Sequence, residues 1–125
     1  MNVPSHLKYT SDHEWILIEG DIATIGITDY AQGELGDVVF VELPAVDESF
    51  EKGDVAATIE AVKTVADVFL PLSGSIAAVN EALDDESDLI NKDAFGAGWI
   101  LKIKISDLSE LDSLMNAEDY TASIS

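Results

Sequence analysis

Two apolar runs meet at a single lysine in the stretch Val55-Ala56-Ala57-Thr58-Ile59-Glu60-Ala61-Val62-Lys63-Thr64-Val65-Ala66-Asp67-Val68-Phe69-Leu70. Runs rich in Val and Ile favour β-strands, so residues 55–62 and 65–70 are expected to pair as a hairpin with Lys63 at its turn. Turn positions more often hold Gly, Asn or Asp. A lysine there indicates either a use for an exposed amine or a side chain that merely solvates the turn.

Similar short runs recur on both sides of this hairpin. Residues 15–18 and 22–27 flank Glu19-Gly20-Asp21, which predicts a second hairpin with a glycine in its turn. Further strands are expected at residues 38–43, 73–79 and 99–105. This spacing predicts a mostly β chain, folded as one antiparallel sandwich or flattened barrel over residues 1–125.

Two helices are expected between and after the strands. Thr28 is a suitable N-cap for a short helix over residues 29–34, with Gly33 and Gly36 placed to end it. A C-terminal helix is predicted from apolar residues at helical spacing after a capping-box-like start, and we expect it to cover one flank of the sheet. The apolar residues are Leu108, Leu111, Leu114 and Met115, and the start is Asp107 with Glu110.

Charge and composition exclude several classes of function. The chain of 125 residues carries 25 acidic residues against 6 lysines and has a formal net charge of −19. Nucleic-acid binding depends on basic contacts with phosphate, so DNA and RNA are not expected as partners. Such a field favours a monomer that meets partners with basic surfaces. Acidity as a solubility device or a halophilic adaptation is the alternative explanation.

Metal and thiol chemistry also find little support. Cysteine is absent, which excludes disulfides, thiolate nucleophiles and thiolate zinc sites, so redox chemistry would need a cofactor. Asp84-Asp85-Glu86-Ser87-Asp88 lacks the Gly and Glu that an EF-hand loop needs at its sixth and twelfth positions, and a solvated acidic loop is expected there. His6 and His13 have no close third nitrogen or sulfur ligand. No metal site is predicted.

The residues around Lys63 carry a specific family resemblance. Residues 60–67, with Pro71-Leu72-Ser73-Gly74 and Val79-Asn80, closely resemble the lipoylation hairpin of the glycine cleavage H-protein family. Biotinyl domains share the lysine at the turn but usually flank it with methionines, whereas Val62 and Thr64 flank it here. The resemblance extends over nearly the whole chain, through His13-Glu14-Trp15, residues 26–44, residues 89–93 and residues 98–103.

The chain departs from the family pattern at a few positions. Residues 93–96 read Asp-Ala-Phe-Gly where members commonly have Asp-Pro-Tyr-Gly, which removes the rigidity of a proline and a tyrosine hydroxyl. Ala61 and Ala66 stand where serine is frequent, and Ser87-Asp88 replaces a common proline. None of these changes removes the amine of Lys63.

The resemblance implies a lipoyl-domain-like fold and a carrier that catalyses no step alone. Lipoate would be joined to Lys63 as an amide by a lipoate ligase or a lipoyl or octanoyl transferase. Glycine decarboxylase would load an aminomethyl group onto one sulfur, and a tetrahydrofolate-dependent aminomethyltransferase would remove it with release of ammonia. Dihydrolipoyl dehydrogenase would then reoxidise the dithiol with NAD.

The resemblance also implies a shallow cleft that shelters the loaded arm. Glu14 and Asp67 are the candidate carboxylates that hold the cationic amine through charge-assisted hydrogen bonds, although each fits a solvated charge at a strand end equally well. His13 is a candidate for lining the same cleft. A histidine beside a core tryptophan is more often a hydrogen-bonded structural residue.

Two other functions stay open at this point. The first is a lipoyl relay or a carrier subunit for 2-oxo acid dehydrogenase complexes, which needs the same lysine and the same fold. The second is a small β-barrel enzyme with Glu14, Asp67 and His13 as an acid–base set, although the chain has no recognisable combination of nucleophile, base and oxyanion donors. With no signal peptide or membrane span in the sequence, a cytoplasmic location is expected, or a mitochondrial one if a transit peptide was removed.

Overall fold

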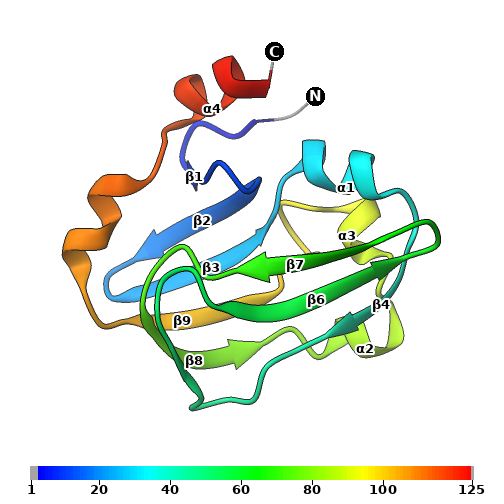
Figure 1. Ribbon diagram of the computed structural model, residues 1–125, viewed down its shortest axis with the longest axis horizontal. Coiled ribbons are helices and arrows are strands. Elements are labelled where there is room, and N and C mark those ends of the chain that lie inside the picture. The colour runs from blue at the N-terminus through cyan, green and yellow to red at the C-terminus, as the bar shows by residue number, and fades with distance from the viewer. Residues whose placement is uncertain (1–2, 125) are drawn as a thin grey trace.

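The apolar runs around Lys63 form a hairpin in the computed structural model, which describes residues 3–124 (Figure 1). Strand β6 (Val55–Ala61) pairs antiparallel with β7 (Val65–Phe69), and β4 (Val38–Glu42) pairs with the other side of β6. Glu60 pairs with Val65, and the N–H of Ala61 donates to the carbonyl of Thr64 at 2.8 Å. Lys63 therefore lies in the turn, as the sequence predicts.

A six-stranded antiparallel sheet faces this three-stranded one. Its hairpin of β2 (Glu14–Glu19) and β3 (Ile22–Ile27) turns at Gly20, whose φ is +66°, as expected from the glycine there. The strands β1 (Lys8–Tyr9) and β5 (Ser49–Phe50) have two residues each and were too short for their sequence pattern to predict. In spatial order the sheet contains β1 (Lys8–Tyr9), β2 (Glu14–Glu19), β3 (Ile22–Ile27), β9 (Leu101–Ile105), β8 (Gly74–Val79) and β5 (Ser49–Phe50).

The main core lies between the two sheets and follows from strand alternation. In β9, Leu101, Ile103 and Ile105 are buried while Lys104 is exposed. Fully buried Ile25, Ile59 and Ile76 bring β3, β6 and β8 into the same core. Each such side chain contributes roughly 1.5–3 kcal/mol by leaving water. The mostly β sandwich expected from the sequence is confirmed.

A second, smaller core forms where the two ends of the chain meet. Its buried members are Leu7, Tyr9, Trp15 and Tyr120. The indole N–H of Trp15 donates to the carbonyl of Ala94 at 2.9 Å, and its ring lies so close to Gly26 that a Cβ there would be 2.6 Å from it. Only glycine fits at position 26 for this reason.

The first helix agrees with the sequence in all but one detail. Helix α1 (Asp29–Leu35) begins after Thr28, whose hydroxyl accepts from the N–H of Ala31, and it ends at Gly36 with φ +79°. Gly33 lies inside the helix and does not end it. Of the acidic loop expected at residues 84–88, Asp84 and Asp85 belong to the short helix α2 (Ala82–Asp85), and residues 86–88 link it to α3 (Leu89–Lys92). Leu83 and Ile90 anchor these two helices in the core.

The C-terminal helix exists but begins later than predicted. Residues Leu108–Ser113 form the 3₁₀ helix η1, and α4 (Ala117–Ile124) follows. Leucines three residues apart match the three residues per turn of a 3₁₀ helix. The Glu110 carboxylate accepts from the N–H and hydroxyl of Ser73 rather than completing a capping box. Within residues 3–124, no helix is long and apolar enough to cross a membrane.

Candidate functional site

Lys63 is an exposed amine at the far end of the β6–β7 hairpin. Its side chain passes over the end of α1, where a Cβ added to Gly36 would lie 3.3 Å from Cε and 3.8 Å from Nζ. Within residues 3–124, no ion pair or hydrogen bond engages this amine. Val62 and Val65 beside it are 75% and 58% exposed. The amine is thus accessible to a modifying enzyme.

Asn91 joins the end of α1 to the start of β4. Its side-chain carbonyl accepts from the N–H of Val38 at 2.9 Å, and its NH₂ group donates to Gln32 Oε1 and to the carbonyl of Gly36. These bonds hold the end of α1 and the start of β4 together, and the side chain of Lys63 lies over this surface. Asn91 belongs to a block that resembles the family, but its sequence does not show that it joins segments more than 50 positions away.

A cleft of about 320 Å³ lies beside this surface, between α1 and β7. It is lined by all three residues that the family resemblance nominated, His13, Glu14 and Asp67. Tyr30 and Glu34 of α1 also line it, and no sequence argument singled them out. Their spacing of four residues on a helix that follows a recognisable N-cap is the signal that places both on one face.

Glu14 lies at the deep end of this cleft and is only 2% exposed. Its Oε2 accepts from the N–H of Phe69 at 2.7 Å, and its Oε1 accepts from the hydroxyl of Thr10 at 3.2 Å. Desolvation by burial raises the pKa of Glu14 to about 8, against the lowering effect of these hydrogen bonds. Burial therefore favours the protonated form of this carboxyl.

Asp67 occupies a different position from Glu14. It pairs with Thr58 across β6 and β7, and its side chain is exposed. Asp67 lies at the rim of the cleft, where its side chain is exposed to solvent. The two candidate carboxylates thus differ in environment, one solvated at the mouth and one buried at the floor.

His13 is held by several contacts. Its φ of +66° is uncommon for a residue other than glycine. The carbonyl of His13 accepts from the N–H of Thr28, its Nδ1 lies 2.9 Å from the hydroxyl of Tyr120, and its ring centroid lies 4.8 Å from that of Tyr30. The interpretation of His13 as a hydrogen-bonded structural residue fits these contacts, and the residue also lines the cleft.

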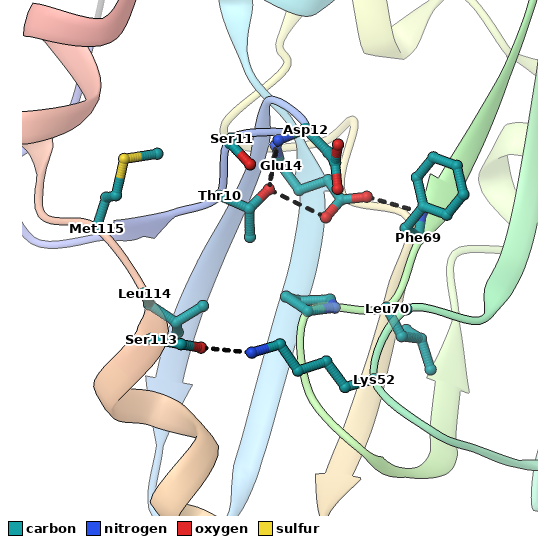
Figure 2. Close-up of a pocket in the computed structure, with 12 residues that line it drawn as sticks. Thr10, Ser11, Asp12, Glu14, Lys52, Phe69, Leu70, Ser113, Leu114 and Met115 are labelled. Carbon is teal, nitrogen blue, oxygen red and sulfur yellow. Dashed lines mark hydrogen bonds between the residues drawn. The ribbon is translucent and has the colours of Figure 1, made fainter.

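A second cavity, of about 460 Å³, lies on the other side of Glu14 (Figure 2). Glu14 and Asp12 line both cavities, so the buried carboxyl forms part of the wall between them. Across this second cavity, Nζ of Lys52 donates to the hydroxyl of Ser113 at 2.7 Å. Among residues 3–124, no group of three or more His, Asp or Glu side chains is placed to hold a metal ion.

Comparisons with known proteins agree with this geometry. The family model described as Glycine cleavage H-protein matches residues 7–125. The chain is 55% identical over 122 residues to the glycine cleavage system H protein of Bacteroides thetaiotaomicron, covering 98% of this chain and 97% of that protein. It is 48% identical over 124 residues to that of Staphylococcus saprophyticus, covering 99% and 98%. The crystal structure of a glycine cleavage system H protein from Mycobacterium marinum is similar with a TM-score of 0.89, at 38% identity and 98% coverage of both chains.

Proposed function

The chain belongs to the glycine cleavage H-protein family, and from that premise we propose that it is the lipoyl carrier of the glycine cleavage system, with lipoate attached to Lys63. The observation that carries this proposal is the exposed amine of Lys63 at the hairpin tip, which has no partner among residues 3–124. As a carrier it catalyses no step by itself. A cytoplasmic location stays a prediction from the sequence.

The residues around Lys63 fit a covalently bound arm. Gly36 leaves open the space under Cε and Nζ that any Cβ would occupy. The neighbouring cleft begins on the same helix, at Leu35 and Glu34, and ends at Glu14. When attached, lipoate supplies the dithiol chemistry that this cysteine-free chain lacks, and one of its sulfur atoms would accept the aminomethyl group of glycine.

The two carboxylates then have separate tasks in binding the cationic amine. Asp67, exposed at the mouth, attracts it electrostatically. Glu14, buried and protonated without a cation, ionises as the amine arrives, because a neighbouring positive charge favours the carboxylate form. The charge-assisted hydrogen bond that results is stronger in this desolvated position than one on the surface. Docking of the amine thereby releases a proton from Glu14.

Membership of this system implies partners within it. We assign the loading step to glycine decarboxylase, the unloading step to the aminomethyltransferase and reoxidation to dihydrolipoyl dehydrogenase. A lipoate ligase or a lipoyl or octanoyl transferase would modify Lys63. The net charge of −19 suits partners whose active-site entrances are basic.

Intact mass and peptide mapping after incubation with lipoate, ATP and a lipoate–protein ligase test the attachment. We expect a gain of one lipoyl group, confined to the peptide that contains Lys63. The variant Lys63→Arg should gain none, while Lys92→Arg, which changes an exposed lysine paired with Asp88, should gain one as the unchanged protein does. A folded wild-type protein that gains no mass, while a known H protein is modified in parallel, would sink the proposal.

Glycine-dependent exchange of bicarbonate with glycine decarboxylase separates the glycine cleavage role from a lipoyl relay. Exchange with the lipoylated protein is expected, and its absence would favour the relay. Lys63→Arg also tests the alternative of a small acid–base enzyme. An enzyme that uses Glu14, Asp67 and His13 would keep its activity without Lys63, whereas a lipoyl carrier would lose its function.

A further inference from the structure

The C-terminal helix reaches the cleft through one buried side chain. Tyr120 of α4 is fully buried and stacks on Tyr9, with ring centroids 4.8 Å apart and planes at 10°. Its hydroxyl lies 2.6 Å from Thr28 Oγ1 and 2.9 Å from His13 Nδ1. One phenol thus contacts the N-cap of α1 and a residue that lines the cleft.

The available hydrogen atoms decide the direction of these bonds. Thr28 is 1% exposed, and its Oγ1 already accepts from the N–H of Ala31, so its own hydrogen needs an acceptor. Within residues 3–124, the Tyr120 oxygen is the acceptor that the geometry supplies. Tyr120 then has its single hydrogen left for His13 Nδ1, which must be unprotonated to accept it.

We propose that Tyr120 is a positioning residue for the cleft, which fixes His13 as the neutral tautomer with its hydrogen on Nε2. The opposite chain of bonds, from His13 to Tyr120 to Thr28, would leave the buried hydroxyl hydrogen of Thr28 without an acceptor. The positive φ of His13 and its ring contact with Tyr30 also help to fix the position of the imidazole. Backbone strain of this kind persists only where neighbouring contacts hold it.

The position of His13 also matters for the loaded arm, an inference that rests on the proposed function. His13 and Tyr30 form adjoining parts of the cleft wall beside Glu14. A fixed imidazole keeps that wall in one arrangement and leaves the Glu14 carboxyl as the group that meets the amine. Loss of the Tyr120 hydroxyl should loosen the wall while leaving Lys63 accessible for modification.

Nitrogen-15 NMR of the unlipoylated protein at pH 8 tests the tautomer without any partner enzyme. The chain has two histidines, and exposed His6 serves as an internal reference. In the wild type we expect His13 to be held as the Nε2–H form, and in Tyr120→Phe we expect mixed tautomers like those of His6. The matched control is Tyr9→Phe, which removes the stacked neighbour's hydroxyl, bonded to the carbonyl of Pro4, and should leave His13 unchanged.

A wild-type spectrum with His13 mainly in the Nδ1–H form would overturn the inference, and this result needs no variant to fold. A folded Tyr120→Phe protein with the wild-type tautomer would overturn it as well. Retention of the aminomethyl group on the lipoylated protein is the second readout. Tyr120→Phe should lose that group about five-fold faster, the ratio that one ordinary hydrogen bond supports, while Tyr9→Phe retains it.

The two proposals fail in different ways. If the wild type loses the aminomethyl group as fast as a free lipoamide adduct, the sheltering cleft is wrong, and the NMR result still decides the role of Tyr120. If the wild type retains the aminomethyl group well and Tyr120→Phe retains it equally well, the result would count against the role of Tyr120 and leave the sheltering cleft intact. Lipoylation at Lys63 is expected to be equal in all three proteins.

Discussion

The hairpin tip at Lys63 and the cleft floor at Glu14 are built in opposite ways. The tip consists of neighbouring residues and is exposed. The N–H of Ala61 donates to the carbonyl of Thr64 across the turn, and the N–H of Val62 donates to the carbonyl of Asp37. The floor is a carboxyl that is 2% exposed and bonded to Phe69, which lies 55 positions away in the chain. A local motif presents the reactive amine, whereas tertiary packing creates the environment for its cargo.

This difference teaches where each region is vulnerable. Substitutions at the tip change what can be attached and leave stability nearly intact, because few contacts are lost. Substitutions at the floor disturb buried hydrogen bonds and therefore alter folding as well as docking. Four experiments test that contrast.

Moving the lysine by one position should have the largest effect. In the double variant Val62→Lys, Lys63→Ala, the amine stays at the tip but no longer lies over Gly36. We expect no detectable lipoylation by mass spectrometry, with the free energy of unfolding within about 0.5 kcal/mol of the wild type. Full modification of this variant would show that any exposed amine at the tip suffices.

The buried carboxyl should give stability a distinctive pH dependence. Burial raises the pKa of Glu14 to about 8 in the folded chain, from the ordinary value of 4.5. Between pH 4.5 and pH 8 the folded state therefore holds a proton that the unfolded state has released. The contribution of Glu14 to stability is fully present below about pH 4.5 and is lost as pH rises to about 8. The loss is roughly 5 kcal/mol at most.

Urea unfolding of the wild type and Glu14→Gln across pH 4.5–8 measures this effect. Glutamine keeps a carbonyl oxygen for the N–H of Phe69 but cannot ionise. The difference between the two proteins should therefore grow with pH in favour of Glu14→Gln. Parallel curves would show that Glu14 is charged throughout and that its burial has little effect on its pKa.

Truncation at the floor should cost more than truncation at the tip. Glu14→Ala leaves the N–H of Phe69 without its acceptor and opens a cavity. We therefore expect the free energy of unfolding at pH 5 to fall by about 3 kcal/mol. Glu60→Ala, an exposed residue three positions before Lys63, should cost within about 0.5 kcal/mol. Equal losses in urea unfolding would contradict the contrast between the two regions.

The smallest expected effect concerns Gly33 inside α1 and Gly36 at the C-cap of α1. Gly36→Ala places a Cβ against Lys63 at a positive φ and should destabilise the chain by about 1–2 kcal/mol and slow lipoylation. Gly33→Ala meets nothing within 4 Å inside the helix and should stabilise it by about 0.5–1 kcal/mol. Thermal unfolding and the initial rate of lipoylation measure both. A stable Gly36→Ala protein with an unchanged rate of lipoylation would show that Gly36 does not contribute to the site.

The C-terminal region shows how sequence patterns can mislead. Leu108, Leu111 and Leu114 predicted an α-helix, but their three-residue spacing fits the 3₁₀ helix that forms, and Leu108 is 56% exposed. The α-helix that follows has one fully buried residue, Tyr120, and its apolar face consists of that residue with Ala117 and Ile124, a stripe too short for periodicity to stand out in the sequence. Its stability comes from packing against β1 and the second core.

Local sequence determined the hairpins, the N-cap at Thr28, the C-cap at Gly36 and the place of Lys63, because these depend on residues within a few positions of one another. The sequence also nominated Glu14, Asp67 and His13 by family resemblance. Only the tertiary structure decided that Glu14 is buried with a raised pKa, that Asp67 is exposed, and that His13 meets Tyr120 across 107 positions. Burial and long-range hydrogen bonds depend on what the fold brings together, and no local pattern encodes them.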